Sequence, residues 1–267
     1  MTKPLFADRV HACEQFASMI TNLCHKTLQA DNYLLGQYKQ YKDIPQHVLE
    51  DPKYSKEYSI DFNADTNVAE MLEEELSRYP LTTRFSLLES QLSKDKKTTV
   101  LEYGGSLGQS WQYFKNDYNL EYYNIEVKTT VDLANNFYKM DNFFNHVPSI
   151  NEVPQIDLIY SRCSIHYDPE WKTVLKNFAK LKPSMIILQH LTADRGIEDF
   201  WTVQYCRGSA CQWHFFNFEG LNNEMEKLGY KLTYAKDDPY DFEKLFRQWP
   251  EDKKFRPDKH MDLIYEL

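Results

Sequence analysis

A cluster of glycines is the feature of this sequence that points most directly to chemistry. Of the eight glycines in the 267-residue chain, Gly104, Gly105 and Gly108 lie close together. They follow a short β-type run, residues 98–103, and precede a segment of helical character, residues 107–116. Since glycine has no Cβ, its backbone can turn sharply and lie against a ligand at the carboxyl end of a strand. The cluster therefore predicts a nucleotide-type ligand.

The spacing of these glycines argues against a dinucleotide cofactor, whose fingerprint is G-x-G-x-x-G. Counted from Gly104 the third position is Ser106, and counted from Gly105 it is Leu107, so neither count fits. A nicotinamide-dependent sugar-modifying enzyme is therefore the weaker interpretation. A tight turn that binds no ligand stays open as well.

Two acidic residues complete a different pattern. Glu102, Gly104 and Gly108 fit the spacing acid-x-Gly-x-x-x-Gly. Glu126 lies near the end of the next predicted strand, residues 122–127, and the two oxygens of a carboxylate suit the two hydroxyls of a ribose. The same acid is expected for NAD, so Glu126 indicates a nucleoside without choosing the cofactor. Alone, it could be a solvated acid at a strand end.

Four segments carry a closer resemblance, and they occur in order at residues 101–108, 123–127, 157–167 and 216–230. Over about residues 80–235 the chain resembles a family of bacterial class I S-adenosylmethionine-dependent methyltransferases associated with surface-polysaccharide gene clusters. The resemblance implies a Rossmann-like fold, S-adenosyl-L-methionine as cofactor, and methyl transfer to a small or glycan-type acceptor. A sugar oxygen in surface-polysaccharide biosynthesis is one such acceptor.

The resemblance also implies which residues bind the cofactor. Glu102 would help to position its amino-acid part, and Glu126 would accept hydrogen bonds from both ribose hydroxyls. Many members of the family carry a third glycine where this chain has Ser106, which is a departure from the pattern. The full expected set is Glu102, Tyr103, Gly104, Gly105, Ser106, Leu107, Gly108, Glu126, Val127, Ser161 and Arg162.

Two histidines are the candidates for catalysis, since an oxygen acceptor benefits from a general base near the transferred methyl group. His166 follows a predicted strand at residues 156–161, and its alternative role is packing or exposure to water. His190 ends another predicted strand and is the rival base. His214 lies in an aromatic run and is expected to pack in the core or in a lid. Because neither base is compelling, a non-catalytic nucleoside-binding or scaffold protein on the same fold stays open.

Strands and helices alternate after residue 95, which predicts an α/β domain over residues 96–267. We expect a Rossmann-like class I methyltransferase sheet, mostly parallel and with the last strand antiparallel. Residues 1–95 are predicted to form a helical N-terminal cap or arm, with helices at 5–40 and 67–93. The other expected strands cover residues 185–190, 230–235 and 261–266, and the other expected helices cover 129–138, 170–181 and 218–228.

Two insertions are expected in this domain. Residues 191–217 hold several aromatic side chains and one arginine, which is typical of a lid or an acceptor site. A surface helix with ordinary core aromatics is the alternative. Residues 236–260 are polar, and their charges are expected to form a solvated face.

The overall composition argues against several classes of binding partner. The net charge of −9 and the isoelectric point near 5.4 argue against nucleic acid, because a nucleic-acid binder needs a basic face. Five scattered cysteines predict reduced thiols in a cytoplasmic protein and no metal site. No apolar run is long enough for a membrane span. The expected partner is the acceptor molecule, and a homo-oligomer is left open.

Overall fold

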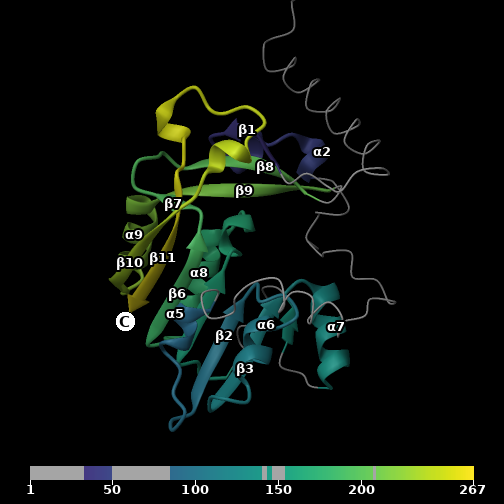
Figure 1. The fold of residues 1–267 in the computed structure, drawn as a ribbon, viewed down its shortest axis with the longest axis vertical. Coiled ribbons are helices and arrows are strands. Elements are labelled where there is room, and N and C mark those ends of the chain that lie inside the picture. The colour runs from purple at the N-terminus through teal and green to yellow at the C-terminus, as the bar shows by residue number, and fades with distance from the viewer. Residues whose placement is uncertain (1–32, 50–84, 140–142, 146–153, 207–208) are drawn as a thin grey trace, which may run out of the picture.

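The computed structural model describes residues 33–49, 85–139, 143–145, 154–206 and 209–267. At its centre is a seven-stranded sheet with the strand order β10-β11-β6-β5-β2-β3-β4 (Figure 1). The bounds of these strands are β2 Thr98–Tyr103, β3 Leu120–Glu126, β4 Phe143–Asn145, β5 Leu158–Arg162, β6 Met185–Leu191, β10 Lys231–Pro239 and β11 Lys259–Glu266.

The direction of the strands follows the expectation. Strands β2 to β6 pair in parallel with one another. The last strand, β11, runs antiparallel to both of its neighbours, β6 and β10. The predicted mixed α/β arrangement with a large central sheet is therefore confirmed. All five parallel strands end at one edge of the sheet, which is where this architecture collects ligands.

Helices flank the sheet, and their apolar positions explain why they pack there. In α8, Trp171, Val174, Leu175 and Phe178 recur at three- and four-residue steps and are buried. Neighbouring residues of β2 enter different core clusters, Val100 in one and Leu101 in the other, so both faces of the sheet are covered. The α-helices of the described residues are α2 Gln46–Leu49, α5 Ser86–Glu89, α6 Gln109–Phe114, α7 Lys128–Tyr138, α8 Trp171–Lys180 and α9 Phe218–Lys227.

A second sheet of four strands lies over one end of the first, in the order β1-β8-β9-β7 (Figure 1). Three of its strands come from the expected insertion at 191–217, so the alternative of a surface helix there is wrong. Their bounds are β1 Tyr33–Tyr38, β7 Ala193–Asp194, β8 Phe200–Cys206 and β9 Ser209–Asn217.

Strand β1 corrects the helix predicted over residues 5–40. Residues 33–38 are extended because β8 pairs with them antiparallel along its length. The Thr202 hydroxyl donates to the carbonyl of Gly36 over 2.7 Å, and Leu34 is fully buried. Such long-range pairing outweighs a local helical period. The remainder of that helix, residues 5–32, lies outside the described residues, as does the predicted helix at 67–93 up to residue 84.

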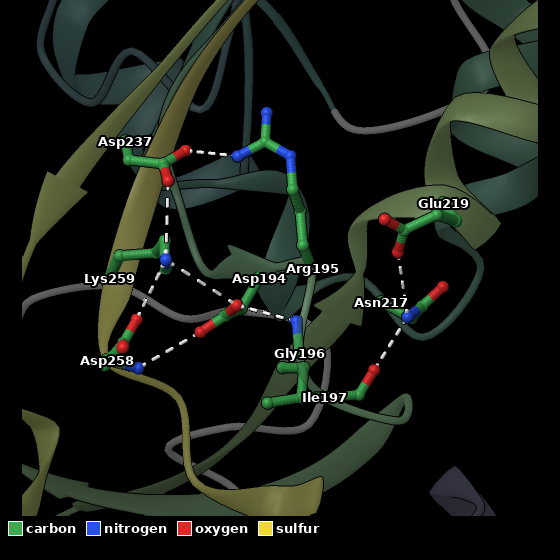
Figure 2. A network of polar contacts seen from close by, with 9 residues as sticks. All are labelled: Asp194, Arg195, Gly196, Ile197, Asn217, Glu219, Asp237, Asp258 and Lys259. Atoms are coloured by element: carbon green, nitrogen blue, oxygen red, sulfur yellow. Dashed lines mark hydrogen bonds and ion pairs between the residues drawn. The ribbon is translucent and has the colours of Figure 1, made fainter.

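Charged side chains join the second sheet to the first (Figure 2). The Asp194 carboxylate on β7 accepts from the backbone N–H of Asp258 over 3.2 Å. Arg195 donates to Asp237 on β10 over 2.6 Å, and the Lys259 ammonium lies 3.4 Å from the other oxygen of Asp237. This network lies where β7 approaches β10 and β11, and it fixes the second sheet above that end of the first.

The second expected insertion, residues 236–260, is divided between solvent and core. Several of its charged side chains, including Glu243 and Lys253, are exposed, whereas others, including Arg256 and Lys259, are only partly exposed. Three aromatic side chains, Phe242, Phe246 and Phe255, are buried against the second sheet. Among the described residues, no helix is both long and apolar enough to cross a membrane.

Candidate functional site

The loop between β2 and α6 adopts backbone conformations that suit glycine. Gly104 has φ of +73° and Gly108 has φ of +77°, both in the left-handed region. A Cβ on Gly104 would also lie 2.2 Å from the Ser164 hydroxyl oxygen, so this position has no room for a side chain. The Ser164 hydroxyl in turn donates to the Gly104 carbonyl over 3.0 Å. The glycines are therefore required by the shape of the loop and by its contact with the loop after β5.

The backbone conformation at Ser106 is one that glycine adopts more readily than serine. Its φ is +50°, so it occupies the left-handed conformation that a glycine would take without strain. The Ser106 N–H donates to Glu126 over 2.8 Å, and its carbonyl accepts from the Asn124 amide over 2.8 Å. Surrounding hydrogen bonds thus hold this serine in a backbone conformation that is typical of glycine.

Side chains from β3 hold the glycine loop from one side. Asn124 is fully buried, and its side-chain oxygen accepts from the Gly105 N–H over 3.1 Å while its amide nitrogen donates to Ser106. From α7, the Tyr138 hydroxyl donates to the Leu107 carbonyl over 2.6 Å. Asn124 was not among the expected site residues. Its signal in the sequence is a polar side chain within the otherwise apolar run 122–125.

Glu126 lies at the carboxyl end of β3, against the same loop. One of its oxygens accepts from the Ser106 N–H and the other from the Val127 N–H over 2.9 Å. Burial raises the pKa of this carboxyl from 4.5 to about 7, although both N–H groups favour the charged form. The predicted ribose-binding acid is therefore in contact with the glycine loop, and its charge changes near neutral pH.

The Glu102 side chain is buried between the glycine loop and the core and does not lie on the exposed side of the loop. Its buried carboxylate accepts from the Tyr122 hydroxyl over 2.6 Å and from the Ser110 hydroxyl at the start of α6. A Cβ on Gly105 would meet the Glu102 carboxyl carbon at 2.6 Å. In this position Glu102 joins β2, β3 and α6, and its carboxylate supports the loop from below.

Tyr103 points toward the loop after β5. Its hydroxyl donates to Asp168 over 2.6 Å, and its ring packs edge-on against Phe178 at 5.4 Å. Burial, and after it the charge of Asp168, raises the pKa of Tyr103 well above 10. Tyr103 therefore contributes to the wall of the site through a neutral, hydrogen-bonded phenol.

The carboxyl end of β5 brings the next two expected residues, Ser161 and Arg162, to the same edge of the sheet. Ser161 pairs with Tyr103 across the strands and is buried. The Ser161 hydroxyl and the Arg162 Nε are buried polar atoms with no hydrogen-bond partner among the described residues. Buried polar groups without partners are rare in proteins, and a bound ligand is one way to satisfy them.

His166 is enclosed by aromatic side chains. It is 1% exposed, and its ring stacks on Trp213 at 4.7 Å. Neither of its ring nitrogens has a hydrogen-bond partner within the described part of the chain. Burial, and after it the nearby His190 and His214, lowers the pKa of His166 well below 6.5. The ring is therefore neutral and is closed off from solvent in this conformation.

His190 is more accessible and has a partner. It lies at a β-bulge, where Gln189 and His190 of β6 oppose the single residue Asp262 of β11. Its φ is +53°, and its backbone N–H donates to the Asp262 carboxylate over 2.8 Å. The His190 Nδ1 lies 3.4 Å from Asp238 on β10, and burial lowers the pKa of the ring.

A third histidine, His260, completes this part of the site. It is 4% exposed, and its ring stacks on His190 with the centroids 3.7 Å apart. Burial lowers the pKa of His260 to about 2, so the ring is neutral. Neither Asp238 nor His260 was an expected site residue, because each joins the site only through strand pairing between β10 and β11.

His214 packs in the core, as predicted. It is 3% exposed, and its ring stacks on Trp201 with the centroids 4.2 Å apart. Burial lowers its pKa to about 3.

The two halves of the site share one edge of the sheet. The loop after β5 contacts the glycine loop through Ser164 and contacts β6 through the Cys163 thiol, which lies 3.7 Å from the His190 carbonyl oxygen. One half can therefore hold a nucleoside at Glu126. The adjacent half offers a guanidinium and an accessible imidazole, at Arg162 and His190, to a second molecule.

Comparisons with known proteins find similarity in structure alone. No family model matches the chain, and no curated protein matches it. A similar solved structure is an S-adenosylmethionine-dependent methyltransferase from Mesorhizobium loti, with 10% identity, a TM-score of 0.47, and coverage of 69% of this chain and 97% of that one. Another is the 1,6-didemethyltoxoflavin-N1-methyltransferase from Burkholderia thailandensis, with 10% identity, a TM-score of 0.45, and coverage of 68% and 74%.

The cyclase SpnF is similar to the same degree, with 10% identity, a TM-score of 0.48, and coverage of 68% of this chain and 79% of that one. Likeness at this level does not assign an activity. The function is therefore inferred from the geometry of the site.

Proposed function

We propose that this protein is an S-adenosylmethionine-dependent methyltransferase with a Rossmann-like class I fold. The observation that carries the proposal is the contact between Glu126 and the glycine loop. Because the Glu126 carboxylate hydrogen-bonds to Ser106, the strand-end acid and the glycines occupy one place at the carboxyl edge of the sheet. An adenosyl cofactor requires an acceptor for its ribose hydroxyls and a backbone that can approach it closely, and Glu126 and the glycine loop would supply these.

The residues around the loop fit such a cofactor. Glu126 and Val127 would take the ribose, and the loop from Gly104 to Gly108 would pass close to the amino-acid part. Glu102 would act through the loop that it supports, and Ser161 and Arg162 would complete the wall, since both carry buried polar atoms in need of a partner. When bound, the cofactor supplies an electrophilic methyl group on a sulfonium.

The acceptor would bind beside the cofactor, at the ends of β5 and β6. Arg162 suits a polar or anionic acceptor, and His190 suits activation of a hydroxyl group. Of the two predicted bases we assign this role to His190, because its side chain is 28% exposed whereas His166 is enclosed. A small or glycan-type acceptor, such as a sugar hydroxyl, fits this chemistry. Surface-polysaccharide biosynthesis rests on the family resemblance alone.

The cofactor assignment is tested by ligand-induced thermal stabilisation. S-adenosylmethionine and S-adenosylhomocysteine should raise the melting temperature by mass action, and NAD should not. Glu126→Ala should remove the shift. The matched control is Glu121→Ala, at the opposite end of the same strand, where the carboxylate pairs with the exposed Lys97. The control should keep the shift. No shift with either adenosyl compound in the unmodified protein would contradict the assignment.

The transfer reaction needs an acceptor. Release of S-adenosylhomocysteine should be measured over a panel of nucleotide sugars and glycan extracts. Stimulated release that His190→Gln abolishes, with cofactor binding retained, would support the proposed enzyme. Cofactor binding without release on any acceptor would favour the alternative of a nucleoside-binding protein without catalysis.

A further inference from the structure

Three side chains at the end of the first sheet lie in the arrangement of a metal site. His190, Asp238 and His260 each offer one ligand atom, and these atoms all lie within 4.8 Å of one another. The His190 Nδ1 is 3.4 Å from an Asp238 oxygen. We propose that these three side chains bind a divalent transition-metal ion.

Strand pairing brings the three residues together. Asp238 of β10 lies directly opposite His260 of β11, so their side chains project from the same face of the sheet. The β-bulge in β6 adds one residue opposite Asp262, and this turns His190 onto that face as well. Bulges of this kind often redirect a side chain beside a functional site.

A buried nitrogen gives independent support for a ligand. The Nδ1 atom of His260 is buried and has no hydrogen-bond partner among the described residues. Leaving such a group unsatisfied is costly, and coordination to a metal would satisfy it. The two other side chains leave a way in, since Asp238 is 50% exposed and His190 is 28% exposed. The site is therefore built from a buried ligand with two ligands closer to solvent.

The donor set selects the class of metal. Two imidazoles with one carboxylate suit zinc, iron, cobalt or nickel, whereas calcium and magnesium prefer oxygen ligands. The two rings now stack 3.7 Å apart with 21° between their planes, so they must tilt for both nitrogen lone pairs to meet one ion. Three protein ligands leave at least one coordination position for an oxygen from water or from another molecule.

The position of the site connects it with methyl transfer, and this step rests on the proposed function. An acceptor hydroxyl at the open coordination position would become more acidic, because a bound cation stabilises the alkoxide. In that case His190 would hold the ion in place of acting as the base itself. The acceptor hydroxyl would pass its proton to a water molecule, its oxygen would form the new bond to the methyl carbon, and the bond from that carbon to the sulfonium would break, leaving S-adenosylhomocysteine as a neutral thioether.

Cobalt binding tests the metal site directly. Untagged, metal-stripped protein is titrated with Co²⁺, and the visible d–d absorption of the bound ion is recorded. We expect saturation at one ion per chain. Asp238→Asn should weaken Co²⁺ binding by more than about 10-fold. Losing a residue that only hydrogen-bonds to a metal ligand already weakens binding by about 10-fold or more, and Asp238 would be a ligand itself. The substitution leaves a half-exposed side chain of the same shape, so folding should be unaffected.

The matched control is Asp237→Asn. Asp237 is the adjacent residue on β10, but it projects from the other face toward Arg195 and Lys259 (Figure 2). This variant should bind Co²⁺ as the unmodified protein does. Equal weakening in both variants, or no uptake by the unmodified protein of Co²⁺, Ni²⁺ or Zn²⁺, would overturn the proposal.

The metal titration is separate from the cofactor test. Metal binding is measured without any adenosyl compound, and adenosyl binding is measured in a chelating buffer. Loss of the metal signal with intact nucleoside binding would overturn only the metal site. Intact metal binding without any adenosyl binding would overturn only the proposed function.

Discussion

The ionisation of Glu126 should control how nucleoside binding depends on pH. Burial raises the pKa of this carboxyl to about 7 in the folded chain. Only the carboxylate form can accept hydrogen bonds through both oxygens from a ribose, because a protonated carboxyl has become a donor at one of them. Below the pKa, binding must be accompanied by loss of a proton. The affinity should therefore fall about tenfold between pH 8 and pH 6. Nearly all of this change lies below pH 7, where each pH unit lowers the carboxylate fraction about tenfold.

The probe should be 5′-methylthioadenosine, which carries the ribose without the amino-acid part. The full cofactor has an α-amino group, and such groups titrate at about 7.7–8.0, inside the pH range of the experiment. Calorimetric titrations at several pH values would give the dissociation constants. Glu126→Gln should bind more weakly and should lose the pH dependence.

Folding stability should respond to pH in the opposite direction. The pKa of Glu126 is higher in the folded chain than its ordinary value of 4.5, so the folded chain holds the extra proton between these values. The contribution of Glu126 to the free energy of unfolding is therefore greatest below about pH 4.5 and is lost as the pH rises through about 7. If the affinity for the nucleoside rises with pH while the contribution of Glu126 to the free energy of unfolding falls, the gain in affinity cannot come from a more stable fold. A pH-independent affinity, or the same slope in Glu126→Gln, would refute the reasoning.

The glycine loop gives two further predictions. Gly104→Ala should lower the free energy of unfolding by about 2–5 kcal/mol, because its Cβ would collide with Ser164 at a left-handed φ, whereas Ser106→Gly should change it by less than about 1 kcal/mol. Chemical denaturation measures both, and equal effects would contradict the assigned loop geometry. Asn124→Ala should cost about 1–3 kcal/mol for each loop group that it leaves unpaired, at Gly105 and Ser106, and should weaken adenosyl binding. Unchanged denaturation of that variant would show that Asn124 does not hold the loop.

The sequence predicted the features that depend on neighbouring residues. The alternation of strands and helices and the loop from Gly104 to Gly108 depend on local patterns, and the central sheet follows from them. The position of Glu126 beside the loop was predictable too, because parallel strands end at the same edge. What the spacing could not show is that the Glu126 carboxylate hydrogen-bonds to the loop itself.

The features that the sequence missed depend on pairing between distant segments. Residues 33–38 were included in a predicted helix whose apolar repeat lies at residues 16–28, but their pairing with β8 makes them extended. Asp238 and His260 face one another only because of the register between β10 and β11. A change of one residue in that register would turn one of the two side chains to the other face of the sheet. No local pattern encodes such a register, so Asp238 and His260 could not be identified as neighbours of His190 before the structure.

The loop after β5 explains why the two halves of the site belong together. Ser164 hydrogen-bonds to Gly104 in the glycine loop, and the preceding residue, Cys163, contacts the backbone of His190. Cys163 itself has φ of +52°, so this short loop is held in a strained conformation by contacts on both sides. In-line methyl transfer requires the acceptor and the methyl carbon to be held in one geometry. A loop that contacts both halves is suited to that requirement, and a substitution that relaxes it should lower turnover more than it lowers binding of either molecule alone.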